Sequence, residues 1–140
     1  MTWYLAAFLS AVFAALTTIL AKIGIQNVNS NLATAIRTTV ILLFTWGIVF
    51  FQGGASSISQ LKNSTWLFLI LSGIATGLSW LFYFRALQIG EASKVVPIDK
   101  LSLVLTIILA GIFLKEKITL SIIFGSVLMT VGAIIIAYAK

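Results

Sequence analysis

The sequence predicts an all-α integral membrane protein whose single domain, residues 1–140, crosses the bilayer five times. Of its residues, 61% are hydrophobic and only 9% are charged, whereas a soluble domain carries about 25% charged residues. The apolar residues form five nearly continuous runs of about 19–22 residues, each long enough as a helix to cross a ~30 Å hydrocarbon core. The alternation expected of membrane β-strands is missing from them. The runs cover residues 4–25, 32–51, 66–87, 95–114 and 120–138.

A polar turn at residues 26–31 joins the first two runs and predicts an antiparallel helix pair. Inside the second run lies Arg37, about two helical turns from Asn31. A charge at that depth is costly in lipid and marks a candidate functional position. The longest link, residues 52–65, is rich in Gly and Ser, and we expect its glycine turn at residues 52–55 to be flexible.

The third run presents a polar helical face, because its hydroxyl residues are spaced four, three and four positions apart. A stripe of small and aromatic residues lies beside it. The polar face consists of Ser72, Thr76, Ser79 and Tyr83, and the neighbouring stripe of Gly73, Gly77 and Trp80. We expect the polar face, Trp80 included, to bind substrate, and Gly73 and Gly77 to serve as hinges. The alternative is that these small residues simply let helices pack closely.

The fourth run contains Pro97, Asp99 and Lys100 near its start. A proline inside a helix removes a backbone donor and kinks it, so Pro97 is another hinge candidate. A central charge costs about 2.5–3.5 kcal/mol on insertion, and each large aliphatic residue or Phe returns about 0.3–0.6. Residues 101–114 hold ten such residues, which nearly offset the two charges. The run should insert, and its charges need a partner or a water-filled cavity.

Arg37, Asp99 and Lys100 lie at similar depths from the same membrane side, because the second and fourth runs both start there. An Arg37–Asp99 ion pair would neutralise two buried charges. We interpret the three residues as substrate or coupling-ion contacts that set charge preference. The alternative is a structural bridge, or two cations that extend outward to the headgroups.

The fifth run carries a line of small residues. Ser121 and Gly125 are four residues apart, and Gly125 and Gly132 are seven apart, so they share one side of the helix. This side can pack against the backbone of a neighbouring helix. We expect a dimer seam here, with packing inside the chain as the alternative.

Several function classes are excluded by composition. The chain has no Cys and no His, and its three acids are Glu91, Asp99 and Glu116. We therefore expect no disulfide, metal site, cofactor or catalytic residues, and no enzyme activity. The net charge of +6 does not predict nucleic-acid binding, because the Lys and Arg residues lie mostly at helix ends, where they reach phosphate headgroups.

The distribution of Lys and Arg gives only a weak orientation. One side of the membrane receives three of them and the other receives four, before Arg37 and Lys100 are counted. The first set is Lys62, Lys115 and Lys117, and the second is Lys22, Arg85, Lys94 and Lys140. The side with four is predicted to be cytoplasmic, but so small a bias is compatible with dual topology.

The stretch FYFRALQIGEASKVVPIDKL at residues 82–101 resembles the EamA-type domain of the drug/metabolite transporter superfamily, in particular its single-domain, five-helix bacterial and archaeal branch. Residues 115–117 and the Gly125–Gly132 spacing resemble the end of that domain. The resemblance implies one half of an inverted-repeat transporter. Because five spans are an odd number, two copies must insert in opposite senses to rebuild the whole.

The small multidrug-resistance relatives carry a glutamate in the first helix that exchanges protons for cations. The first run of this chain has no acid, which argues against proton-coupled export of cationic drugs. Any proton coupling would fall to Asp99. The basic surplus within the membrane favours neutral, zwitterionic or anionic substrates.

The resemblance thus implies a secondary transporter of the inner (plasma) membrane that moves small metabolites, amino acids or drug-like compounds by alternating access. Its expected partners are a second, antiparallel copy of the chain, membrane lipids and the small-molecule substrate. Two alternatives remain, a membrane assembly factor and a flippase-like protein that handles lipids.

Overall fold

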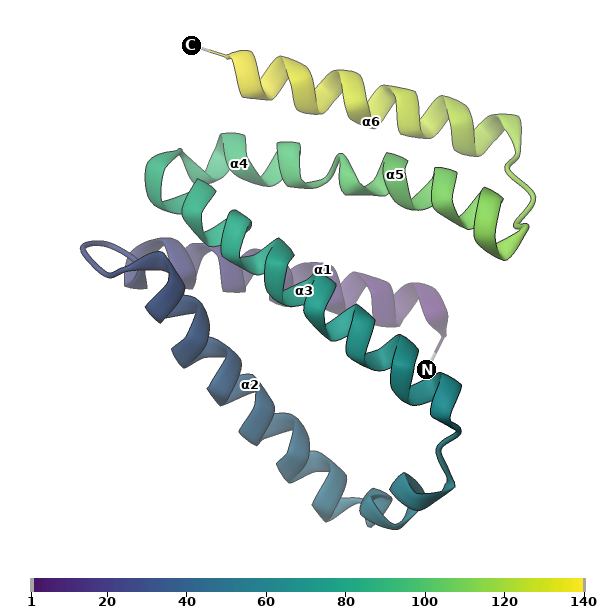
Figure 1. Cartoon of the computed structure of the whole chain (residues 1–140). Coiled ribbons are helices and arrows are strands. Elements are labelled where there is room, and N and C mark those ends of the chain that lie inside the picture. The colour runs from purple at the N-terminus through teal and green to yellow at the C-terminus, as the bar shows by residue number, and fades with distance from the viewer. Residues whose placement is uncertain (1, 140) are drawn as a thin grey trace. The chain divides into compact units, whose positions relative to one another are not determined.

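The computed structural model describes residues 2–139 and confirms an all-α membrane protein with five spans. Figure 1 shows their order along the chain. The spans are α1 (Trp3–Gly24), α2 (Ser30–Phe51), α3 (Asn63–Ile89), a broken fourth span, and α6 (Leu120–Tyr138); the fourth consists of α4 (Ala92–Asp99), α5 (Ser102–Leu109) and the π-helical turn η2 (Ala110–Leu114). All five are long and apolar enough to cross a membrane.

The chain divides into two compact units, Met1–Gln88 and Ile89–Lys140. The first contains α1, α2 and nearly all of α3. Its buried apolar side chains gather at one end, near the turn between α1 and α2, where Ile25, Phe84 and Leu87 are 2%, 2% and 0% exposed. From that end α2 and α3 draw apart toward the opposite end (Figure 1).

The turn between α1 and α2 depends on two asparagines. Asn27 adopts a left-handed conformation with φ of 60°, which Asn tolerates better than most residues. Asn29 then caps α2, because its Oδ1 accepts hydrogen bonds from the backbone N–H groups of Asn31 (2.9 Å) and Leu32 (3.3 Å).

The link between α2 and α3 is more ordered than the sequence predicts. Gly53 takes a left-handed conformation with φ of 68°, which reverses the chain at the end of α2. A 3₁₀-helix, η1 (Gly54–Gln60), follows and packs back against α2. The glycine turn that suggested flexibility therefore forms a tight reversal that leads into a short helix.

The second unit contains a helix interruption one turn beyond Pro97. The sequence predicts a single kinked helix here, whereas the structure ends α4 at Asp99 and starts α5 at Ser102. Backbone hydrogen bonds spanning three residues replace those spanning four: Leu101 N–H donates to Ile98 O and Leu103 N–H to Lys100 O, both at 3.0 Å. The segment tightens locally, as 3₁₀ turns do.

The span ends in η2, and Lys115 stops it in a left-handed conformation with φ of 55°. Gly111 allows the following chain to approach, since a Cβ there would lie 2.6 Å from Ile118 Cδ1. Both α4 and α5 pack against α6 in this unit, and Figure 1 shows α4 and α5 following one another along the length of α6.

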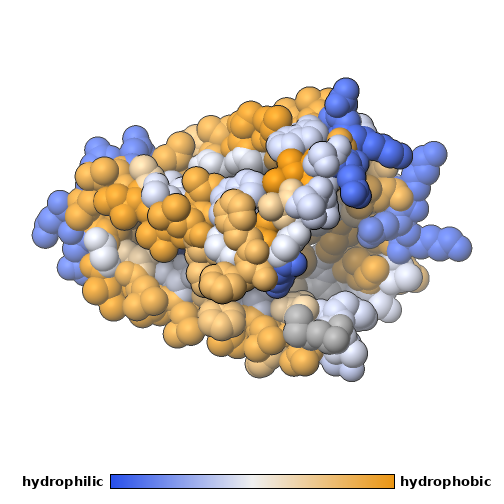
Figure 2. Space-filling view, turned by 90° about the horizontal axis from the view of Figure 1, so that it is seen from below, coloured by the Kyte–Doolittle hydropathy of each residue, from blue (hydrophilic) through white to orange (hydrophobic). Residues whose placement is uncertain are grey.

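Few side chains are buried among the described residues. Apolar groups dominate the surface seen in Figure 2, and large hydrophobic residues of every span are exposed. Such a surface fits a lipid solvent, in which the backbone is satisfied inside each helix and apolar side chains face outward.

Candidate functional site

Arg37 is held inside the first unit by aromatic rings from α3. Its guanidinium carbon lies 4.8 Å from the ring centroid of Trp80 and 4.9 Å from that of Phe84. Both distances are within the ~6 Å range of a cation–π interaction. Phe84 is buried and Arg37 is half-buried. The charge predicted from α2 is therefore turned toward a neighbouring helix.

A hydrogen bond joins α1 to α3 beside this cluster. Thr18 Oγ1 and the Tyr83 hydroxyl lie 2.7 Å apart, and Thr18 is only 8% exposed. Thr18 Oγ1 also donates to Ala14 O at 3.0 Å. Because a threonine hydroxyl has one proton, the Tyr83 hydroxyl is the donor in the interhelical bond.

Two further bonds fasten the same end of the unit. Lys22 Nζ of α1 donates to Leu87 O of α3, and Gln88 Nε2 donates to Val28 O in the α1–α2 turn at 2.6 Å. Lysine near the last carbonyls of a helix also interacts favourably with the helix dipole. Together these bonds bring the ends of α1 and α3 to the start of α2.

Only part of the predicted hydroxyl face of α3 takes part in these contacts with α1 and α2. Tyr83 and Trp80 belong to the contacts just described, whereas Ser72, Thr76 and Ser79 are exposed. Thr76 Oγ1 donates to Ser72 O at 2.9 Å within its own helix. Thr34 and Thr38 of α2 do the same toward Ser30 O and Thr34 O, both at 2.8 Å.

In the second unit, Asp99 and Lys100 pair with each other across 3.6 Å at the break between α4 and α5. Arg37 belongs to the first unit, so the Arg37–Asp99 pair remains a prediction. The substrate role of Asp99 and Lys100 likewise remains a prediction, as does the hinge role of Pro97 inside α4.

The glycine positions predicted as hinges and seam face open space. A Cβ placed at Gly73, Gly77, Gly125 or Gly132 would meet no atom within 4 Å. Ser121 is exposed at the start of the same α6 stripe. The helix surfaces at these residues are thus accessible for packing, and their roles as hinges or seam stay predictions.

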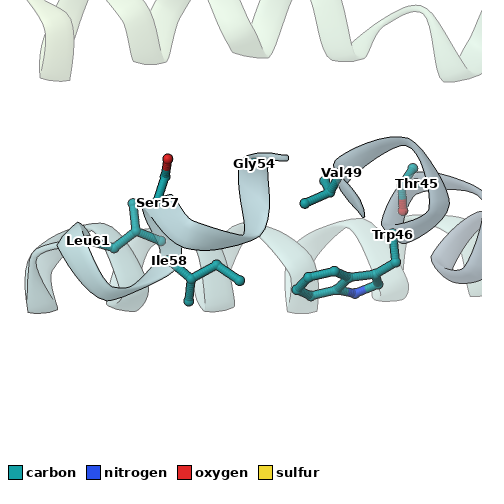
Figure 3. Close-up of a pocket in the computed structure, with 7 residues that line it drawn as sticks. All are labelled: Thr45, Trp46, Val49, Gly54, Ser57, Ile58 and Leu61. Atoms are coloured by element: carbon teal, nitrogen blue, oxygen red, sulfur yellow. The ribbon is translucent and has the colours of Figure 1, made fainter. Parts of the chain in front are cut away.

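A separate pocket of about 270 Å³ lies where η1 folds against the end of α2 (Figure 3). Most of its lining is apolar, and it includes none of the predicted substrate-binding residues; the lining residues are Thr45, Trp46, Val49, Gly54, Ser57, Ile58 and Leu61. Its position at the end of a span places it near the membrane interface.

Comparison with known proteins decides the family. The EamA-like transporter family matches residues 1–138. The chain belongs to this family. A similar protein is an uncharacterized transporter in the cobO 3' region of Sinorhizobium sp., 48% identical over 136 residues, which are 97% of this chain and 96% of that protein. The family and this relative point to a multi-pass membrane transporter rather than an enzyme.

Two other relatives differ in coverage. The uncharacterized transporter YvbV of Bacillus subtilis is 32% identical over 120 residues, which are 86% of this chain but 39% of YvbV. The uncharacterized protein MJ1333.1 of Methanocaldococcus jannaschii is 34% identical over 71 residues, which are 51% of this chain and 52% of that protein. No solved structure matches the chain significantly.

Sequence reasoning missed three contributors to the first unit of this EamA-like chain: Thr18, Phe84 and Gln88. The sequence offered a signal for Thr18, which lies four residues from both Ala14 and Lys22 and so shares their helical face. Phe84 and Gln88 are four residues apart on α3 and follow Trp80 by the same spacing. Extending the Trp80 stripe by two turns would have found both.

Proposed function

We propose that this EamA-family chain is a secondary transporter that moves small metabolites, amino acids or drug-like compounds by alternating access in the inner (plasma) membrane. The observation that carries the proposal is the guanidinium of Arg37 inside a membrane-spanning unit, stacked on Trp80 and Phe84. Charges retained within spans are costly in lipid and are functional-site candidates by default.

The functional form we propose is an antiparallel homodimer. Alternating access in inverted-repeat transporters uses two halves related by an axis in the membrane plane, and five spans supply one such half. The open surfaces at Gly73, Gly77, Gly125 and Gly132 support helix contacts with a second copy, because small residues let membrane helices approach closely.

Transport is tested with purified protein in liposomes and a panel of radiolabelled metabolites and amino acids. We expect protein-dependent flux of at least one compound, and Arg37→Gln should lower that flux about tenfold or more, the effect of losing one charge-assisted hydrogen bond. Arg85→Gln is the matched control, because Arg85 is exposed and its side chain donates to Gln88 Oε1 at 3.1 Å. Absence of flux across the whole panel would refute transport.

Dual insertion is tested separately. The sequence has no Cys, so single cysteines at Thr2 and Ala139 report each end of the chain to an impermeant thiol reagent in intact cells. Antiparallel pairing predicts about half labelling at both positions. Complete labelling at one position and none at the other would exclude it.

The dimer seam is tested by replacing its glycines with a large side chain. Gly125→Leu and Gly132→Leu should each reduce the dimer fraction measured by single-molecule photobleaching in liposomes. Gly47→Leu is the control, since a side chain at Gly47 also meets no atom within 4 Å but Gly47 lies outside the proposed seam. Equal dimer fractions in all three variants would remove α6 as the seam.

A second candidate function, lipid handling, is favoured by the apolar pocket between α2 and η1. Its volume of about 270 Å³ suits a segment of an acyl chain. Fluorescent-lipid scrambling in the same liposomes distinguishes the two functions: protein-dependent scrambling without solute flux would support lipid handling.

A further inference from the structure

The guanidinium of Arg37 lies over two aromatic rings and still has N–H groups to donate. A guanidinium stacks through its face and donates through N–H groups in its plane. The guanidinium carbon lies over the Trp80 and Phe84 rings, 4.8 and 4.9 Å from their centroids. Within the first unit, over residues 2–88, the structure gives the Arg37 side chain no hydrogen-bond or ion-pair partner. A fork of donors in a membrane-spanning segment thus calls for an acceptor.

The first unit supplies no countercharge for this arginine. Residues 1–88 include no Asp or Glu. In the second unit, Glu91 pairs with Lys94 at 3.2 Å and Asp99 with Lys100 at 3.6 Å. An isolated charge is costly to remove from water unless it is paired, so the site favours a ligand that brings its own negative charge.

The surroundings of the guanidinium indicate the rest of the ligand. Trp80 and Phe84 give an aromatic wall, and Tyr83, the next polar group on α3, already donates its proton to Thr18. The site therefore combines one planar set of charged donors with apolar surface. A planar carboxylate matches the donors bidentately, and an apolar or aromatic body matches the wall.

We propose that Arg37, stacked on Trp80 and Phe84, is a carboxylate-recognition subsite that takes small monocarboxylates with an apolar or aromatic body. The proposal rests on the proposed transport function, whose substrate class it names. The aromatic rings keep the guanidinium within the unit, and its N–H donors select the charge of the ligand.

Binding is tested with three probes of nearly equal shape and different charge: phenylacetate, phenylacetamide and phenethylammonium. Protein carrying Trp3→Phe, Trp46→Phe and Trp66→Phe keeps Trp80 as its sole tryptophan, so its emission reports on the subsite. We expect phenylacetate to bind more tightly than the other two. Arg37→Gln should weaken phenylacetate about 10- to 100-fold, the range for a hydrogen bond to a charged group, and leave phenylacetamide unchanged.

Two further variants separate recognition from folding. Arg37→Lys keeps the charge but loses the planar fork, so phenylacetate affinity should fall between that of the parent and that of Arg37→Gln. Arg85→Gln should retain the affinity of the parent. Equal binding of phenylacetate and phenylacetamide, no binding of phenylacetate, or an unchanged preference in Arg37→Gln would each overturn the proposal.

A lipid phosphate presents similar acceptor chemistry, so the titrations are run in nanodiscs of phosphatidylcholine alone and of phosphatidylcholine with phosphatidylglycerol. Equal phenylacetate affinity in both supports a solute site. Loss of affinity in the anionic discs assigns Arg37 to a headgroup and overturns the proposal. Charge-selective binding without liposome flux would refute the transport function and leave the subsite supported. Flux without charge-selective binding would support transport and refute the subsite.

Discussion

The bond between Thr18 and Tyr83 permits a quantitative test of how α1 and α3 are held together. The two oxygens are 2.7 Å apart, at the most frequent separation for O–H···O bonds. Tyr83→Phe removes the donor but leaves Thr18 bonded to Ala14 O, so the variant should cost about 0.5–1.5 kcal/mol. Thr18→Val leaves the half-buried Tyr83 hydroxyl without its acceptor, which should cost more, about 1–3 kcal/mol.

The double variant, Tyr83→Phe with Thr18→Val, isolates the coupling energy of the hydrogen bond between α1 and α3. Hydrogen bonds between membrane helices average ~0.6 kcal/mol in such cycles, with a maximum near ~1.7. The short distance and the 8% exposure of Thr18 place this bond in the upper half, at about 0.8–1.5 kcal/mol. The assay is reversible unfolding in mixed micelles, followed by tryptophan fluorescence as the fraction of denaturing detergent increases.

Thr76→Val provides the control cycle. Thr76 lies on the same helix as Tyr83, and its hydroxyl bonds to Ser72 O within α3. Combined with Tyr83→Phe it should show a coupling near zero. If the Thr18–Tyr83 coupling also falls below about 0.3 kcal/mol, the additivity expected of independent sites, the reasoning that this bond joins the two helices is refuted.

Three more predictions concern residues at turns and helix ends, and each is a change in the free energy of unfolding measured in the same assay. Asn29→Ala removes the acceptor for the Asn31 and Leu32 N–H groups and should destabilise the protein by about 1 kcal/mol; no change would contradict its role as a cap. Lys115→Gly should stabilise it by up to about 1 kcal/mol, because a left-handed residue with φ of 55° loses its steric penalty; a loss of stability would contradict this. Gly111→Ala places a Cβ 2.6 Å from Ile118 Cδ1, but that methyl ends a flexible side chain, so the cost should stay below about 1 kcal/mol and be relieved by Ile118→Val; a larger, unrelieved cost would mean that the backbone carries the strain.

The sequence predicts the spans well because hydrophobic length is a local property. In lipid only helices and closed barrels satisfy the backbone, and continuous apolar runs without the alternation of barrel strands leave the helix. The link after α2 is predicted less well, since the conformation of Gly53 depends on a single φ angle that composition does not specify. The break at Lys100 is similar. Pro97 predicts an irregular helix, but the position of the break depends on which backbone N–H groups bond to the carbonyl three residues earlier.

The residues of the candidate site likewise fall into those that the sequence predicted and those that it did not. Arg37, Trp80 and Tyr83 were predicted because a charge or a polar aromatic residue is conspicuous in an apolar run. Phe84 and Thr18 were not, because one Phe or Thr in a span looks like its lipid-facing neighbours until a partner helix is known. Pairing between helices is a tertiary property, and the sequence of one helix carries little information about it.

The side chains of Lys22 and Gln88 both reach main-chain oxygens, those of Leu87 and Val28. A carbonyl group is present whichever residue occupies the accepting position. Replacement of Val28 or Leu87 can therefore alter packing while leaving these two hydrogen bonds intact. Only the donor positions, Lys22 and Gln88, require a particular side chain. These two hydrogen bonds therefore constrain the side chains of Lys22 and Gln88, whereas the side chain at position 87 is constrained by its burial in the core and not by the bond.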